Sequence, residues 1–180
     1  AGAAFFGARA IIDGLRTSIT LSAQMEGVKR GFDNLAKSSG FAADTFKKLN
    51  AATDGTMGAM ELMTQANNAM LLGIVETEDE MAEMFDIAQR LASVMGKDTA
   101  FGIESMTTGL GRQSKLMLDN LGIMVDIKDA NIAYAKAANK TVQELTDLEK
   151  KQAFTNEALK QGRELVAKAG VEVLTTKDRM

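Results

Sequence analysis

Residues 77–96 read TEDEMAEMFDIAQRLASVMG, and the spacing of their apolar side chains decides the fold class. Apolar residues recur here every three or four positions, which places them on one face of an α-helix. They are Met81, Met84, Phe85, Ala88, Leu91, Ala92 and Met95. Thr77 and Glu80 match the capping box that closes a helix N-terminus, and Gly96 stands where a left-handed residue ends a helix. The stretch therefore predicts a helix from about Glu78 to Met95.

The same combination of apolar stripe, polar start and glycine end recurs along the chain. We expect further helices over residues 17–37, 42–53, 58–72, 98–108, 112–121, 128–138 and about 146–169. Two capping boxes, Thr141 to Glu144 and Thr146 to Glu149, leave two starts open for the last helix. Only IMVDI at 123–127 has a β-type composition, and this isolated run predicts a buried extended connector.

The amino-acid composition agrees with an all-α fold. The 180 residues include no Pro, whose ring breaks helix interiors, and the 16 Gly are expected to end helices. We predict about eight helices, arranged as a central irregular bundle with longer flanking helices. The expected regions are an N-terminal helical arm (1–40), a compact helical core (41–145), and a long C-terminal helix and tail (146–180). Both flanking helices are long enough to project as arms.

The residue types that are missing exclude several kinds of chemistry. The chain has no Cys and no His, which removes the usual zinc ligands and any Ser-His-Asp or Cys-His arrangement. Its charges are mixed, with a formal net charge of −3, and no basic stripe indicates a specific nucleic-acid partner. A hydrolase with paired carboxylates remains as a rival, but the acidic residues match helix caps and surface positions. We therefore expect no enzyme activity, no catalytic residue, no cofactor and no metal.

The chain begins AGAAFFGARAII, without an initiator Met. This start fits either a mature N-terminus or a piece of a longer protein. It does not have a basic start followed by a long apolar run, so we do not expect a signal peptide. No stretch approaches the roughly 18 uninterrupted apolar residues of a membrane-spanning helix, so we expect none.

Residues 109–123, GLGRQSKLMLDNLGI, combine glycines with Arg and Ser and so raise the question of phosphate binding. A P-loop requires GxxxxGK followed by Ser or Thr, and GxGxxG would require Gly in place of Ser114. Neither pattern is present. We interpret the stretch as a turn system in which two glycines end one helix and a third ends the next. Its residues are Gly109, Gly111, Asp119, Asn120 and Gly122.

The acidic run ETEDEMAEMFD at 76–86 lacks the alternating ligands and glycine turn of an EF-hand. Acidic residues in a first helical turn also interact favourably with the helix dipole. We interpret the run as a capped, solvated helix N-terminus.

The chain contains 12 Met, most of which we expect to fill the core. Met side chains also adapt to a bound partner, and four of them lie on a helix rich in small residues. Met57, Met60, Met63 and Met70 are the candidates for such a partner surface.

Three stretches carry a family resemblance. They are DGTMGAMELMTQANNAMLLGI (54–74), AQRLASVMGKDTAFGIESMTTGLGRQSKLMLDNLGIMVD (88–126) and AKAANKTVQELTDLEKKQAFTNEAL (135–159). Together they resemble tape measure proteins of long-tailed bacteriophages, over about residues 30–165. The ordered motifs are Asn67-Asn68-Ala69, Gly96-Lys97-Asp98, Gly109–Ser114, Leu118-Asp119-Asn120-Leu121-Gly122-Ile123, Leu145-Thr146 and Glu149-Lys150-Lys151-Gln152-Ala153. One departure is Asn139-Lys140-Thr141, where Gly-Lys-Thr is expected, and it concerns a local turn.

The resemblance implies a structural role. Tape measure proteins assemble in the host cytoplasm, lie inside the tail tube of the virion, and set the length of the tube. They leave the tube when DNA is delivered. The implied partners are tail-tube and tail-end proteins and further copies of the same chain, commonly as a trimer. Family members are much longer than 180 residues, so this chain would be one region, and its frequent glycines indicate a folded knob on a rod-like protein.

A membrane-active helical protein is the alternative function. Such a protein would act during genome delivery or as a toxin, in transient contact with the host membrane. Helices rich in Met, Ala and Gly can lie at a membrane surface, although none here is long and apolar enough to insert alone.

Overall fold

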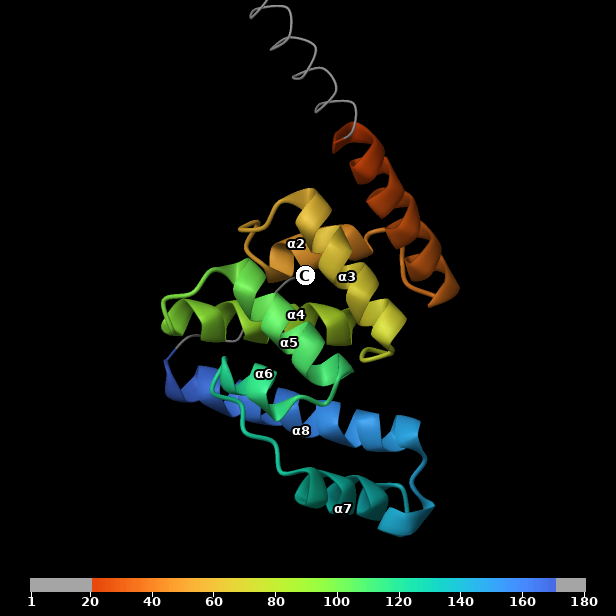
Figure 1. Cartoon of the computed structure of the whole chain (residues 1–180), viewed down its shortest axis with the longest axis vertical. Helices are drawn as coiled ribbons and strands as arrows, with labels where there is room; N and C mark the ends of the chain where they lie inside the picture. Colours follow the sequence, from red (N-terminus) through yellow and green to blue (C-terminus); the bar gives the residue numbers. More distant parts are fainter. Residues whose placement is uncertain (1–20, 171–180) are drawn as a thin grey trace, which may run out of the picture.

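The computed structural model describes residues 21–170, which form eight α-helical segments and one 3-10 turn without any β-strand (Figure 1). The helices are residues 21–38, α2 (Thr45–Ala52), α3 (Ala59–Leu72), α4 (Glu78–Val94), α5 (Thr99–Gly111), α6 (Lys115–Asp119), α7 (Ile127–Ala137) and α8 (Asp147–Lys168), with η1 (Val142–Glu144) before α8. The predictions of an all-α fold and of about eight helices are confirmed. The start of the predicted helix at residue 17 and the tail from 171 to 180 lie outside the described residues.

The helices are stacked in layers around α4 and α5 (Figure 1). Helices α2 and α3 cover one side of this central pair, while α6 and α8 cover the other. Helix α7 lies outermost and packs mainly against α8. One continuous apolar core joins the helices, and its largest fully buried side chains include Phe85, Phe154, Leu49, Leu62, Ile74, Met81 and Met84.

Helix α4 forms at the predicted place and is more deeply buried than predicted. The Glu80 N–H donates to the Thr77 side chain at 3.1 Å, as expected for an N-cap. The Glu80 carboxylate, however, accepts from the Glu76 N–H at 2.8 Å instead of reaching back to Thr77. Ile87 and Asp86 are buried together with the predicted stripe from Met81 to Ala92, because α2, α5 and α8 all pack against α4. Met95, the last residue of the predicted stripe, is 43% exposed.

Helix α8 lies along the bundle and does not project from it, contrary to one expectation. Gly162 permits the close approach, because a Cβ added there would lie 2.6 Å from Ile87 Cγ2. The Lys151 ammonium donates to the Leu72 carbonyl at the end of α3, at 2.6 Å. The apolar face of α8 includes Phe154, Ala158, Leu159 and Val166, which are all buried.

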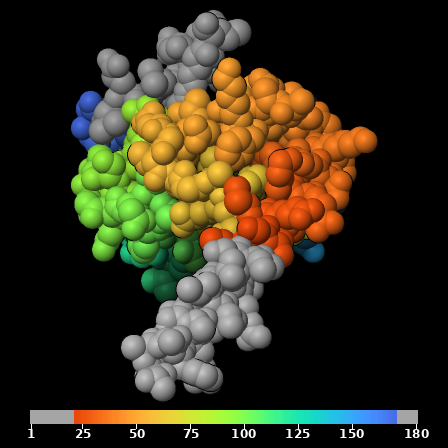
Figure 2. Space-filling view, turned by 90° about the horizontal axis from the view of Figure 1, so that it is seen from above, coloured from red at the N-terminus to blue at the C-terminus, as the bar shows by residue number. Residues whose placement is uncertain are grey.

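The helix over residues 21–38 packs on the bundle through its second half. Phe32 is buried and meets Phe46 edge to face, with 6.3 Å between ring centroids. Figure 2 shows this helix, in red, lying against the orange and yellow surface of α2 and α3. Residues 21–27 are exposed and extend beyond the bundle (Figure 1).

Candidate functional site

The predicted turn system consists of two successive helix ends. Helix α5 continues through Gly109 and Gly111, so the predicted break at these glycines is wrong. The helix ends in a Schellman motif, in which the Ser114 N–H donates to the Gly109 carbonyl at 2.8 Å. The left-handed residue of this motif is Gln113, with a φ of 51°.

Gly109 and Gly111 are explained by packing, not by a helix break. A Cβ on Gly109 would lie 2.6 Å from Leu118 Cδ2, and a Cβ on Gly111 would lie 2.5 Å from Leu72 Cδ1. The two glycines therefore let α5 approach α6 on one side and the end of α3 on the other. Helical glycine costs roughly 0.5–1 kcal/mol relative to Ala, so close approach is the compensating gain.

The second helix end matches the prediction more closely. The Ile123 N–H donates to the Leu118 carbonyl at 3.1 Å, and the Gly122 N–H donates to the Asp119 carbonyl at 2.9 Å. Gly122 has a φ of 72°, the left-handed conformation that this motif requires. Asp119 and Asn120 contribute backbone to the turn, while their side chains are exposed.

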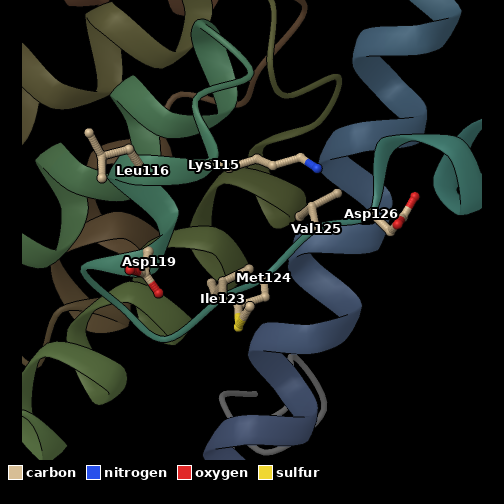
Figure 3. A pocket seen from close by; sticks show the side chains of 7 residues that line it. All are labelled: Lys115, Leu116, Asp119, Ile123, Met124, Val125 and Asp126. Atoms are coloured by element: carbon tan, nitrogen blue, oxygen red, sulfur yellow. The ribbon is translucent and has the colours of Figure 1, made fainter.

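A hollow of about 460 Å³ opens beside this turn (Figure 3). Its lining comes from α6 and from the connector that leads to α7, as Lys115, Leu116, Asp119, Ile123, Met124, Val125 and Asp126. Leu116 and Met124 are the most exposed of its apolar residues, at 78% and 74%. The connector predicted for 123–127 is shorter and less buried than expected, because Ile127 already begins α7 and only Ile123 and Val125 are buried.

Asp126, one of the two carboxylates at this hollow, has structural partners. Asp126 Oδ1 accepts from the N–H groups of Asp129 and Lys128, at 3.1 and 2.8 Å, and so caps α7. These backbone hydrogen bonds, with the nearby charges of Lys115 and Lys128, hold the pKa of Asp126 below its usual range. A carboxylate committed to a helix cap, with its pKa held low, is a poor proton donor near neutral pH.

The acidic run at 76–86 is a capped helix N-terminus, as predicted, but it is not simply solvated, because it joins three helices. Glu78 accepts hydrogen bonds from the Ala42 N–H at 2.8 Å, from Thr45 Oγ1 at 2.7 Å, and from Lys48 of α2. Burial raises the pKa of Glu78, but the hydrogen bonds from Lys48, Thr45 and Ala42 outweigh that effect and hold it below its ordinary value. We call this cluster the Glu78 clasp.

The same run also contacts α8. Glu80 accepts from Gln152 at 3.3 Å, and Glu83 pairs with Arg163 at 2.9 Å. Asp86 is buried and pairs with Arg90 at 2.9 Å. Arg90 is a local partner, four residues from Asp86, whereas Gln152 and Arg163 come from a distant part of the sequence that no local pattern in the run could have revealed.

The four candidate Met residues do not share one surface environment. Met57 and Met63 are buried in the core, while Met60 and Met70 are half-buried. Only the last two are therefore available to a partner in this structure.

Within residues 21–170, no group of three or more Asp or Glu residues is placed to hold a metal ion. In the same part of the chain, no helix combines the length and apolarity needed to span a membrane. No known protein-family model matches the chain. No solved structure matches it either.

Proposed function

We propose that this chain is a structural region of a bacteriophage tail tape measure protein. In this proposal it lies inside the tail tube of the virion, after assembly in the host cytoplasm, and leaves the tube during DNA delivery. Its partners are tail-tube and tail-end proteins and further copies of the chain. No residue has a catalytic role.

The location of most of the resemblance motifs at helix ends supports the proposal, although Asn67-Asn68-Ala69 lies within α3. Gly96-Lys97-Asp98 joins α4 to α5, where Asp98 Oδ1 accepts from the Phe101 N–H at 2.7 Å. Gly109–Ser114 and Leu118–Ile123 form the two Schellman motifs described above. Thr146 and Glu149 form the capping box of α8. A structural role requires residues that specify the turns between helices, and these motifs contain such residues.

The one departure from the family pattern, at Asn139, also lies in a turn at a helix end. Asn139 has a φ of 54°, and the Lys140 N–H donates to the Ala135 carbonyl at 2.8 Å. Asn is the residue after Gly that best tolerates this left-handed conformation. The departure therefore leaves the turn intact.

The layered bundle supports a knob on a longer rod-like protein. A single continuous helix contributes about 1.5 Å of length for each residue. Residues 45–168 instead fold back repeatedly, so that α4 is covered by α2, α5 and α8. We propose that this region docks at one end of the tail and partly unfolds to pass through the tube.

The experiment compares two in-frame deletions in the phage or prophage that encodes the chain. One removes residues 45–168 and the other removes an equal length of helical sequence elsewhere in the same gene. Tail length is measured by electron microscopy. We expect the control deletion to shorten tails by about 1.5 Å per residue and the knob deletion to shorten them far less or to block tail completion.

Two results would contradict the proposal. One is unchanged tail assembly and length in both deletions, because the chain would then have no part in the tail. The other is leakage of lipid vesicles caused by the isolated chain, together with its absence from purified particles, which would favour the membrane-active alternative.

A further inference from the structure

Helix α7 is attached to the bundle differently from the other helices. It lies at the edge of the molecule, on the side of α8 that faces away from α4 and α5 (Figure 1). Its packing is mainly against α8, with a smaller contact to η1. Only Ala130 and Ala135 of its 11 residues are buried, whereas α4 buries nine of 17.

The interface between α7 and α8 is built from small side chains. Ala153 and Gly162 lie nine residues apart on α8, about two and a half turns, and so point to opposite sides of the helix. Gly162 faces Ile87 of α4, yet Ala153 is only 2% exposed. It follows that α8 lies between α4 and α7. The α8 side chain that faces α7 at this point is only an alanine.

The buried residues of this interface are largely separate from the main core. Ala135, Leu145 and Ala153 are all buried but do not belong to the continuous core cluster, whereas Ala130 of α7 does belong to it. The large apolar side chains Ile127 and Ile132 of α7 remain 37% and 46% exposed. Burial free energy scales with apolar area, so α7, which packs extensively against α8 but buries only two alanines, costs less to detach than α4.

An ion pair connects the segment that follows α7 to the start of α8. Lys140, just after α7, donates to Glu149 in the first turn of α8. The same Glu149 carboxylate accepts from the Thr146 N–H at 2.8 Å, which completes the capping box of α8. The Lys140–Glu149 pair therefore connects the chain after α7 to the helix on which α7 rests.

We propose that residues 126–146 form a lid that opens from α8 as one local unfolding unit while α2–α6 and α8 stay folded. The unit begins at the α7 cap, Asp126, and ends at the α8 cap, Thr146. Opening converts a short helix into a segment that can extend by up to about 3.3 Å per residue. If the proposed function is correct, this lid is the first part of the knob to release when the chain is drawn out.

Native-state hydrogen exchange on the full 180-residue chain tests the lid. Local openings expose little surface, so the exchange of α7 amides should depend weakly on denaturant. We expect α7 amides to exchange at least about tenfold faster than the slowest amides of α4 and α5. Equal rates and equal denaturant dependence in α7 and α4 would overturn the proposal. Because this measurement involves no phage, its failure would leave the proposed tail function untouched.

A matched pair of variants tests the closing ion pair. Glu149→Gln removes the charge that pairs with Lys140 while Gln still supports a capping box. Asp147→Asn removes another acid from the same first turn, one whose side chain is fully exposed and pairs with Lys150 at 3.5 Å. We expect Glu149→Gln to accelerate α7 exchange several-fold beyond Asp147→Asn, without accelerating α5. Equal effects of the two variants on α7 would overturn the role of the ion pair.

A third variant places a charge under the lid. Ala135→Asp buries a carboxylate between α7 and α8, and an independent lid should respond by opening permanently. We expect rapid exchange in α7 with retained protection in α4 and α5. Loss of protection throughout the chain would show that α7 is part of the cooperative bundle and would overturn the proposal.

Discussion

Gly162 of α8 lies directly against Ile87 of α4, with only 2.6 Å between Ile87 Cγ2 and a Cβ added at the glycine. Ile87 is fully buried and β-branched, so its side chain has little freedom to move away. This contact brings the long C-terminal helix onto the bundle and thereby determines which face of α8 is left for α7.

The first prediction follows from that contact. Gly162→Ala should destabilise the protein by about 1–3 kcal/mol, because it overpacks a full core. Gly27→Ala is the control, since a Cβ at Gly27 meets nothing within 4 Å in an exposed helix. The control should stabilise by roughly 0.5–1 kcal/mol. Urea unfolding measures both, and equal effects would refute the close approach of α8 to α4.

Gly122 provides a second prediction, this time about backbone conformation. Its φ of 72° disfavours any β-branched residue, and a Cβ would also lie 3.1 Å from Met95 Cε. Gly122→Val should lower the free energy of unfolding by more than about 1 kcal/mol. A thermal melt that matches the unmodified chain would contradict the assigned turn.

Gln113 and Asn139 allow a gain of stability to be predicted. Both are left-handed, with φ values of 51° and 54°, but Asn tolerates this conformation better than Gln. Gln113→Gly should therefore stabilise the protein by up to about 1 kcal/mol, and Asn139→Gly by less. The comparison is made by chemical denaturation. A larger gain at Asn139 would contradict the account of these two helix ends.

The Glu78 clasp predicts a loss of stability in acid. The pKa of Glu78 is lower in the folded chain than its ordinary value of 4.5, so its contribution is present above that value and is lost as pH falls through the folded pKa. The contribution of Glu149 to stability is lost in the same way as pH falls from 4.5 towards 2, because Lys140 and Thr146 lower the pKa of Glu149 from 4.5 to about 2. Stability should therefore decline between about pH 4.5 and pH 2.

The variant Glu78→Gln distinguishes the contribution of Glu78 to the acid-dependent loss of stability from that of Glu149. This change should cost about 1–3 kcal/mol at neutral pH, because a hydrogen-bonded charge is lost. It should also flatten the part of the acid-dependent decline that Glu78 causes. An unchanged slope of unfolding free energy against pH would show that the clasp does not form in solution.

Helix positions could be predicted from the sequence because their signals are local. The stripe from Met81 to Met95 and the caps at Thr77 and Thr146 lie within a few residues of the structure that they specify. The partners of the same helices could not be predicted. Lys48 and Glu78 are 30 residues apart in sequence, and Gly162 meets Ile87 across an even longer interval.

The wrongly predicted break in α5 also results from contacts that local sequence does not reveal. Glycine at 109 and 111 is a helix-ending signal when only neighbouring residues are considered. Its actual role depends on Leu118 and Leu72, which approach α5 only in the folded chain. Gln113, which carries the left-handed turn, has no sequence signal that distinguishes it from its neighbours.

Zero-length cross-linking of intact phage particles tests the central claim most directly. A carbodiimide joins Lys and carboxylate side chains that are in contact, and Lys48 contacts Glu78 in the folded chain. In a single straight helix the same two residues, 30 positions apart, would be separated by about 45 Å. We predict that mass spectrometry will recover the Lys48–Glu78 cross-link from purified particles. If peptides of the chain are absent from the particles, or present without this cross-link while the isolated chain gives it, the account of a folded knob in the phage tail is wrong.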